Sequence, residues 1–187
     1  MRKTFFLLTL GVIFYSCNND KTASATADSA VKKEVPSATG DNLTMPYTAM
    51  YSSQFTVGDQ KYAQMVLNLF KQWDDNKMKD GMSNFADSVN FYTNNWTFHG
   101  SRDALYTASQ QQRDMYPEVK TVVSAYMPVH SVDKNEDWVL IWSTGYTKDK
   151  KGVSDSLNYQ DTWRVNKDGK VDLVYQYTSH EPKADKK

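Results

Sequence analysis

Apolar residues first recur with helical spacing in the region that follows Gly58. Between Asp59 and Asp75 they return every three or four residues, which places them on one face of an α-helix. These positions are Tyr62, Val66, Leu69, Phe70 and Trp73. Asp59 precedes the pattern and can accept hydrogen bonds from the free amides of a first helical turn. The sequence therefore predicts an amphipathic helix over residues 59–75.

Shorter elements are predicted between this helix and Pro117. The stretch NKMKDGMSNFAD contains Gly81 and indicates a turn with a short second helix, and SVNFYTNNWTF is rich in strand-forming residues. A third helix follows in HGSRDALYTASQQQRDMYPEV. Ser101 is its expected N-cap, Asp103 favours its positive end, and Pro117 ends it.

The pattern changes to strict alternation beyond Glu118, which predicts strands to the end of the domain. VKTVVSAYMPVHSV, DWVLIWSTGYT, LNYQDTWRV and KVDLVYQYTSH each alternate or are rich in β-branched residues. Asn166 to Gly169 is a hairpin turn in which Gly169 supplies the positive φ. Helices followed by an antiparallel meander predict an α+β fold.

The N-terminal segment has the pattern of an export signal. MRKTFFLLTLGVIFYSC opens with two cations and continues with an apolar run from Phe5 to Tyr15, which is too short to span a bilayer. We interpret residues 1–16 as a lipoprotein signal peptide, 17–45 as a flexible tether without aromatic rings, 46–181 as the folded domain and 182–187 as a polar tail.

Cys17 is the single cysteine of the chain, so it has no intramolecular disulfide partner. The sequence Phe14-Tyr15-Ser16-Cys17 resembles a bacterial lipobox, which implies lipidation of Cys17 and cleavage before it. Two or three acyl chains would anchor the protein stably to a membrane. The alternative is an uncleaved anchor, or a leader cut elsewhere that leaves Cys17 free. The expected location is the envelope of a Gram-negative bacterium, facing the periplasm or the cell surface.

Composition and motifs argue against several classes of function. The chain has 22 basic and 22 acidic residues, so it lacks the positive charge expected of a nucleic-acid-binding protein. It has no glycine-rich phosphate loop, nucleophile elbow or paired-carboxylate motif, and its three histidines are not spaced as metal ligands. We therefore expect no metal and no cofactor.

The order of elements resembles the nuclear-transport-factor-two-like superfamily, and within it the SnoaL-like proteins. The resemblance covers about 59–177 and is carried by HGSRDALYTASQQQRDMYPEV and DTWRVNKDGKV. It implies a cystatin-like cone, in which a curved antiparallel sheet of about four to six strands wraps around two or three N-terminal helices. It also implies a cavity inside the cone and, as often in this superfamily, a homodimer formed through the outer face of the sheet. Fold alone does not settle function, because the superfamily includes isomerases, dehydratases and proteins without known chemistry.

Asp161 and His99 are the candidate catalytic residues. Alternation places Asp161 on the same strand face as Tyr159 and Trp163, where burial would raise its pKa and make it a base for abstracting an acidified C–H proton. His99 precedes the third helix and would act with it as an acid/base pair. The alternatives are that Asp161 accepts structural hydrogen bonds from a tyrosine hydroxyl or the backbone, and that His99 faces solvent.

Aromatic residues are the remaining candidates for binding a ligand. About half of them are expected to form the core, and the others would line an apolar pocket for a flat or ring-shaped molecule. The candidates are Trp73, Tyr92, Trp96, Tyr106, Trp142, Tyr146, Tyr159, Trp163 and Tyr175. The sequence thus favours a membrane-tethered binding protein for a small apolar ligand. The alternatives are an isomerase or dehydratase that uses Asp161 with His99, and a dimerising interaction protein.

Overall fold

The computed structural model describes residues 44–180. The chain divides after Pro46, and the domain that follows is the subject of this section. Residues 1–43 and 181–187 lie outside the description, and with them the expected signal peptide, Cys17, most of the tether and the polar tail.

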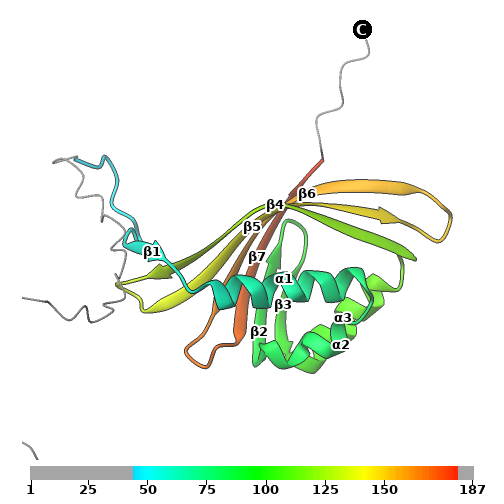
Figure 1. Cartoon of the computed structure of the whole chain (residues 1–187), viewed down its shortest axis with the longest axis horizontal. Helices are drawn as coiled ribbons and strands as arrows, with labels where there is room; N and C mark the ends of the chain where they lie inside the picture. The colour runs from blue at the N-terminus through cyan, green and yellow to red at the C-terminus, as the bar shows by residue number, and fades with distance from the viewer. Residues whose placement is uncertain (1–43, 181–187) are drawn as a thin grey trace, which may run out of the picture. The chain divides into compact units, whose positions relative to one another are not determined.

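Helices precede most of the strands along the domain (Figure 1). The helices are α1 (Gln60–Asp74), α2 (Met78–Gly81), the 3-10 turn η1 (Met82–Asn84) and α3 (Arg102–Arg113). The strands are β1 (Phe55–Val57), β2 (Phe85–Thr93), β3 (Thr97–Ser101), β4 (Glu118–Ser131), β5 (Glu136–Lys148), β6 (Ser154–Val165) and β7 (Val171–Ser179). The predicted helices and the strands beyond Glu118 are all present.

A single curved sheet contains seven strands in the order β1-β4-β5-β6-β7-β2-β3. This confirms the α+β cone, with two differences in detail. The sheet has one strand more than the upper limit expected, because β1 adds a short edge strand to β4 and the stretch predicted as one strand folds into the β2–β3 hairpin. The sheet is also not purely antiparallel, because β2 lies parallel to β7.

Side-chain caps fix where the two long helices begin. The Asp59 carboxylate accepts from the Lys61 amide at 2.9 Å, and the Ser101 hydroxyl accepts from the Ala104 amide at 3.2 Å. The end of α1 is held by the buried Arg113 of α3. Its guanidinium donates to the carbonyl oxygens of Trp73 and Asp74 at 2.8 and 3.0 Å, where a cation is favoured by the helix dipole.

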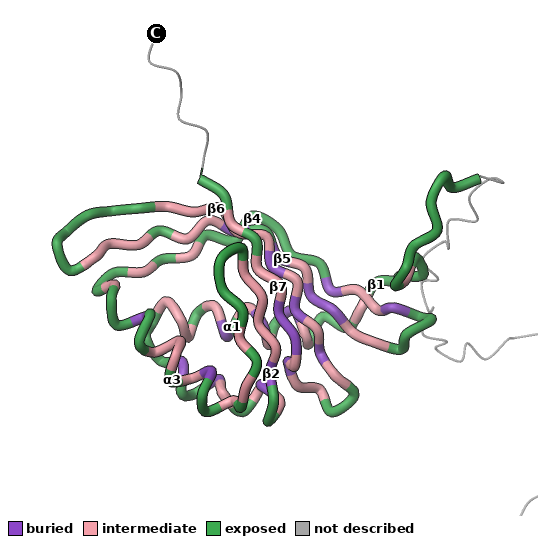
Figure 2. Tube along the Cα trace, turned by 180° about the vertical axis from the view of Figure 1, so that it is seen from behind, coloured by how far each residue is buried: buried purple, intermediate pink, exposed green. Residues whose placement is uncertain are grey.

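The core lies between the helices and one face of the sheet, called here the concave face (Figure 2). Helix α1 contributes Ala63, Val66 and Leu69 to it, and α3 contributes Leu105. The sheet contributes Phe85, Val89, Val139, Ile141, Trp163, Val171 and Val174. The opposite side of the sheet is called here the outer face, and no helix among residues 44–180 covers it. Within residues 44–180 no helix is long and apolar enough to cross a membrane.

Candidate functional site

Asp161 lies at the centre of the concave face, within the strand β6. The sheet register places it directly between Ile141 of β5 and Gln176 of β7. Trp163, which lies two residues further along β6, belongs to the hydrophobic core. Alternation along β6 therefore forces a carboxyl group into the apolar side of the sheet, and the side chain of Asp161 is 0% exposed.

Within the described part of the chain, the Asp161 carboxyl group has a single hydrogen bond to another side chain. The Gln176 amide donates to Oδ1 at 2.8 Å, whereas Oδ2 is buried and has no partner among residues 44–180. Burial raises the pKa of Asp161 to about 7, and the hydrogen bond from Gln176 lowers it only in part. At neutral pH the group is therefore divided between its protonated and ionised forms. Its partner is an amide, not the tyrosine hydroxyl or backbone group expected for a structural role.

Two further polar groups are buried without a partner on the same side of the sheet. Ser143 Oγ and Trp163 Nε1 form no hydrogen bond within the described part of the chain. Ser143 is 4% exposed and stands opposite Tyr159, and the next inward-facing pair along these strands is Ile141 with Asp161. A buried polar group without a hydrogen bond costs about 1–3 kcal/mol, so three of them on one face are unusual.

Tyr159 completes this group, two residues before Asp161 on β6 and opposite Ser143. Its ring covers Gly145 on β5, where a Cβ atom would stand 2.8 Å from Tyr159 Cε2. Glycine is therefore required for the ring to lie against the strand. Burial raises the pKa of the Tyr159 hydroxyl, and the charge of Asp161 raises it further. We call Ser143, Tyr159, Asp161 and Trp163 the concave polar group.

His99 lies on the other side of the sheet. It pairs with Asn90 across the β2–β3 hairpin, and the Asn90 carboxamide oxygen is 2.6 Å from His99 Nδ1. Tyr92, two residues from Asn90, packs edge-on against the imidazole with ring centroids 5.2 Å apart. Tyr92 also stacks on Tyr175. Tyr175 is paired with Thr162, which lies on the face of β6 opposite to Asp161. The structure therefore does not bring His99 and Asp161 together, and His99 faces solvent.

The nine aromatic candidates are divided among three places in the fold. Tyr159 and Trp163 lie on the concave face, and Trp96 packs beside it against Phe98 and Phe91. Four others lie on the outer face, because the strand register places them on the same side of the sheet as Thr162. They are Tyr92, Trp142, Tyr146 and Tyr175. Trp73 and Tyr106 are half-buried on α1 and α3. No single pocket can contain all nine.

Ser143 and Gln176 were not among the sequence candidates. Ser143 alternates with the aromatic residues of β5, but alternation does not show which face of a strand is concave. Gln176 could not be placed from its own strand, because the register between β6 and β7 shifts after Arg164. No group of three potential metal ligands lies together within residues 44–180.

Comparison with solved structures identifies the fold. An NTF2-like protein of unknown function from Exiguobacterium sp. 255-15 matches with a TM-score of 0.53 and 19% identity, over 62% of this chain and 98% of that one. The fold is the NTF2-like cone.

Other solved structures with this fold have names that refer to different reactions. A candidate SnoaL-like polyketide cyclase from Shewanella denitrificans OS-217 matches with a TM-score of 0.55 and 8% identity, over 65% of this chain and 92% of that one. An LEH-like epoxide hydrolase from M. tuberculosis matches with a TM-score of 0.52 and 11% identity, over 64% and 84%. No family model and no curated protein sequence matches the chain.

Proposed function

We propose that the protein binds a small hydrophobic or aromatic molecule at the concave face, with Asp161 as the main polar contact. The observation that carries this proposal is a carboxyl group that is 0% exposed and whose Oδ2 atom has no partner among residues 44–180. Ser143 Oγ and Trp163 Nε1 are buried and unpaired on the same face within the described residues. A ligand with a hydroxyl or carbonyl group would satisfy these atoms, and its apolar body would suit the aromatic surroundings.

A pair of related probes tests this role, namely 2-naphthol and naphthalene, which differ only in one hydroxyl group. We expect the full-length chain to bind 2-naphthol more tightly in calorimetric titrations. Asp161→Asn should weaken 2-naphthol binding about tenfold, because tenfold corresponds to about 1.4 kcal/mol, close to the lower end of the range of about 1.5–3 kcal/mol for a hydrogen bond to a charged group. Naphthalene binding should change little.

Asp87→Asn is the matched control, since it makes the same chemical change at a side chain that is 95% exposed. Equal affinities for the two probes, or equal losses for both in the Asp161 variant, would contradict the proposal.

Proton transfer is the second candidate function, and one observation favours it. A carboxyl group whose pKa is about 7 is suited to accept or donate a proton at neutral pH. Because His99 lies on the outer face, Asp161 would act without it.

The α-protons of 2-tetralone, a ring ketone, exchange with D₂O and can be followed by NMR. We expect the wild type to accelerate this exchange and Asp161→Asn to remove the acceleration; exchange at the buffer rate with wild-type protein would exclude this function for that ketone class.

Tethering to the membrane of a Gram-negative cell envelope is proposed from the sequence of residues 1–45. Lipidation of Cys17 would leave the binding domain attached through the segment that follows it. We expect labelled palmitate to be incorporated into the wild type and not into Cys17→Ala, and the variant to leave the membrane fraction. Label that persists in the variant would contradict lipidation at this residue.

Self-association through the outer face is compatible with either function. Trp142 is 39% exposed and Tyr146 is 47% exposed on this face, and exposed aromatic residues are enriched at protein interfaces. Light scattering that gives the monomer mass at high protein concentration would exclude a homodimer.

A further inference from the structure

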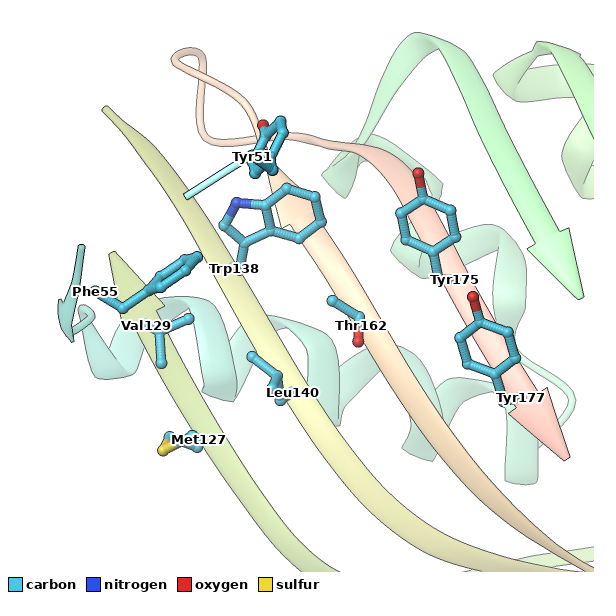
Figure 3. A pocket seen from close by; sticks show the side chains of 9 residues that line it. All are labelled: Tyr51, Phe55, Met127, Val129, Trp138, Leu140, Thr162, Tyr175 and Tyr177. Carbon is cyan, nitrogen blue, oxygen red and sulfur yellow. The ribbon is translucent and has the colours of Figure 1, made fainter. Parts of the chain in front are cut away.

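We propose a second binding site on the outer face of the sheet, which takes a small, neutral, apolar molecule with a hydrogen-bond acceptor. This site is a hollow with a volume of about 530 Å³, within the usual range of ligand pockets (Figure 3). Its lining residues are Tyr51, Phe55, Met127, Val129, Trp138, Leu140, Thr162, Tyr175 and Tyr177. It is separate from the concave polar group, because Thr162 and Asp161 point to opposite faces of β6.

The hollow results from a short side chain placed between long ones. Across the sheet, the register aligns Tyr175, Thr162, Leu140 and Met127 in one row. Thr162 occupies the middle of this row and reaches less far from the sheet than its neighbours. Trp138 of β5 and Tyr177 of β7 stand beside the row and deepen the recess, as Figure 3 shows.

One wall of the hollow is supplied by residues 51–57, which we call the strap. Phe55 and the rest of β1 pair with the edge of β4, where Phe55 lies opposite Ser131. The Val132 amide also donates to the Gln54 carbonyl at 2.8 Å. Tyr51 packs edge-on against Trp138 with ring centroids 6.2 Å apart. The strap thus holds two aromatic rings at the side of the hollow.

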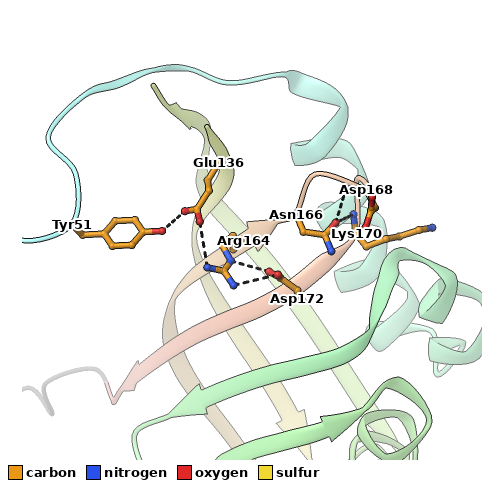
Figure 4. A network of polar contacts seen from close by, with 7 residues as sticks. All are labelled: Tyr51, Glu136, Arg164, Asn166, Asp168, Lys170 and Asp172. Carbon is orange, nitrogen blue, oxygen red and sulfur yellow. Dashed lines mark hydrogen bonds and ion pairs between the residues drawn. The ribbon is translucent and has the colours of Figure 1, made fainter. Parts of the chain in front are cut away.

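A chain of polar contacts fixes Tyr51 in this position (Figure 4). The Tyr51 hydroxyl donates to the Glu136 carboxylate, and Arg164 Nη1 lies 3.5 Å from the other oxygen of Glu136. Arg164 also donates to both oxygens of Asp172, at 2.9 and 3.2 Å. We call Tyr51, Glu136, Arg164 and Asp172 the latch. Glu136, Arg164 and Asp172 do not line the hollow, and among the described residues no charged side chain does.

The lining determines the chemical class of the occupant. The lining residues are uncharged and mostly apolar, so the lining favours a neutral molecule. Trp138 is 9% exposed, and its Nε1 donor is buried without an acceptor among residues 44–180. The indole nitrogen lies on the side of the ring toward Tyr51 (Figure 3). A carbonyl or ether oxygen that enters beside Tyr51 would supply the missing acceptor.

The strap also argues against a second copy of the chain as the occupant. Tyr51 and Phe55 stand at the edge of the recess, and its floor is formed by the short Thr162 side chain. A second sheet lying flat on this face would contact the rim and leave the floor unfilled. Good complementarity at this point requires an inserted molecule, and a ring system has the appropriate shape.

A neutral naphthyl ketone, 6-propionyl-2-(dimethylamino)naphthalene, is a suitable probe because its emission shifts to the blue in an apolar site. The full-length chain with Cys17→Ala, which excludes attached lipid, should bind it with such a shift. Thr162→Trp fills the floor and should raise the dissociation constant more than tenfold. Tyr51→Ala removes a wall without adding bulk and should raise it several-fold.

Two control variants separate this site from its surroundings. Asn158→Trp makes a similar increase in size on the same face of β6, four residues from Thr162, and should leave probe binding unchanged. Asp87→Asn should also leave it unchanged, since the Asp87 side chain is 95% exposed and does not line the hollow. Unchanged binding in both Thr162→Trp and Tyr51→Ala would overturn the proposal. So would light scattering that shows a dimer which Thr162→Trp converts to monomer, because the hollow would then receive a second copy.

Discussion

The two faces of the sheet hold carboxylates in opposite surroundings. Asp161 on the concave face is fully buried, and one of its oxygens has no partner among the described residues. Asp172 on the outer face pairs through both oxygens with Arg164, and its side chain is 23% exposed. Burial without a cation favours the protonated form of Asp161 and raises its pKa. The difference shows that one sheet can hold a buried carboxyl group on one face and an ion-paired carboxylate on the other.

The largest expected effect is on stability, and it differs between two adjacent residues of β5 that lie on opposite faces of the sheet. Ile141 is 0% exposed beside Asp161, whereas Leu140 is half-buried on the outer face. In urea unfolding, we expect Ile141→Ala to lower the free energy of unfolding by about 3–4 kcal/mol, because it leaves a cavity in the core. Leu140→Ala should lower it by about 1 kcal/mol. Equal losses would mean that the outer face is also covered in solution.

A second effect depends on pH and follows from Asp161. Its pKa is about 7 in the folded chain and 3.8 for an unperturbed group, so the unfolded chain releases this proton at a lower pH. The stability that the protonated group provides is therefore fully present below pH 3.8 and is lost as the pH rises toward 7. Between about pH 5 and pH 8, the wild type should lose about 2–3 kcal/mol relative to Asp161→Asn.

Denaturant titrations at several pH values measure the difference in unfolding free energy between the wild type and Asp161→Asn. The contributions of other titratable groups cancel in this difference. Asp87→Asn, at an exposed carboxylate, should follow the wild type across the same range. A constant difference between wild type and Asp161→Asn would show that Asp161 does not change its protonation on this interval.

The smallest effect on stability is expected at the latch on the outer face. Glu136→Gln removes the charge between Tyr51 and Arg164, and such a partly exposed ion pair contributes at most about 1 kcal/mol. The effect on local opening of the strap should be larger than the effect on global stability. Hydrogen exchange at the Val132 amide, which donates to Gln54 of the strap, should become several-fold faster.

Glu118→Gln is the control for this prediction. Glu118 forms an ion pair with Lys148 at the other end of the β4–β5 ladder, and Lys148 Nζ lies 3.0 Å from Glu118 Oε1. If both variants accelerate exchange at Val132 equally, the latch does not hold the strap specifically.

Most of the fold could be predicted from local patterns. The helical spacing around Val66 and Leu69 located α1, and Asp59 and Ser101 cap the two long helices as expected. Alternation in β6 correctly grouped Tyr159, Asp161 and Trp163 on one face. The β2–β3 hairpin was harder to detect, because its turn at 94–96 contains neither glycine nor proline.

The candidate site could be predicted only in part, because alternation separates two faces without naming the buried one. The aromatic residues Trp142 and Tyr146 alternate as regularly as the core residues Val139 and Ile141, yet they lie on the exposed side. His99 is far from Asp161 in the sequence, and only the pairing of β3 with β2 places it on the outer face, opposite to Asp161.

The sequence by itself determined the helices, the strands beyond Glu118, their order and the alternation that groups one acid with two aromatic residues, since these depend on neighbours within a few residues. The tertiary structure decided which face the helices cover, which residue stands opposite Asp161, and where the strap lies. These features depend on strand register and on contacts between segments far apart in the chain, such as Tyr51 with Glu136. Burial then changes the chemistry of Asp161, because the pKa of a carboxyl group depends on its surroundings as well as on its identity.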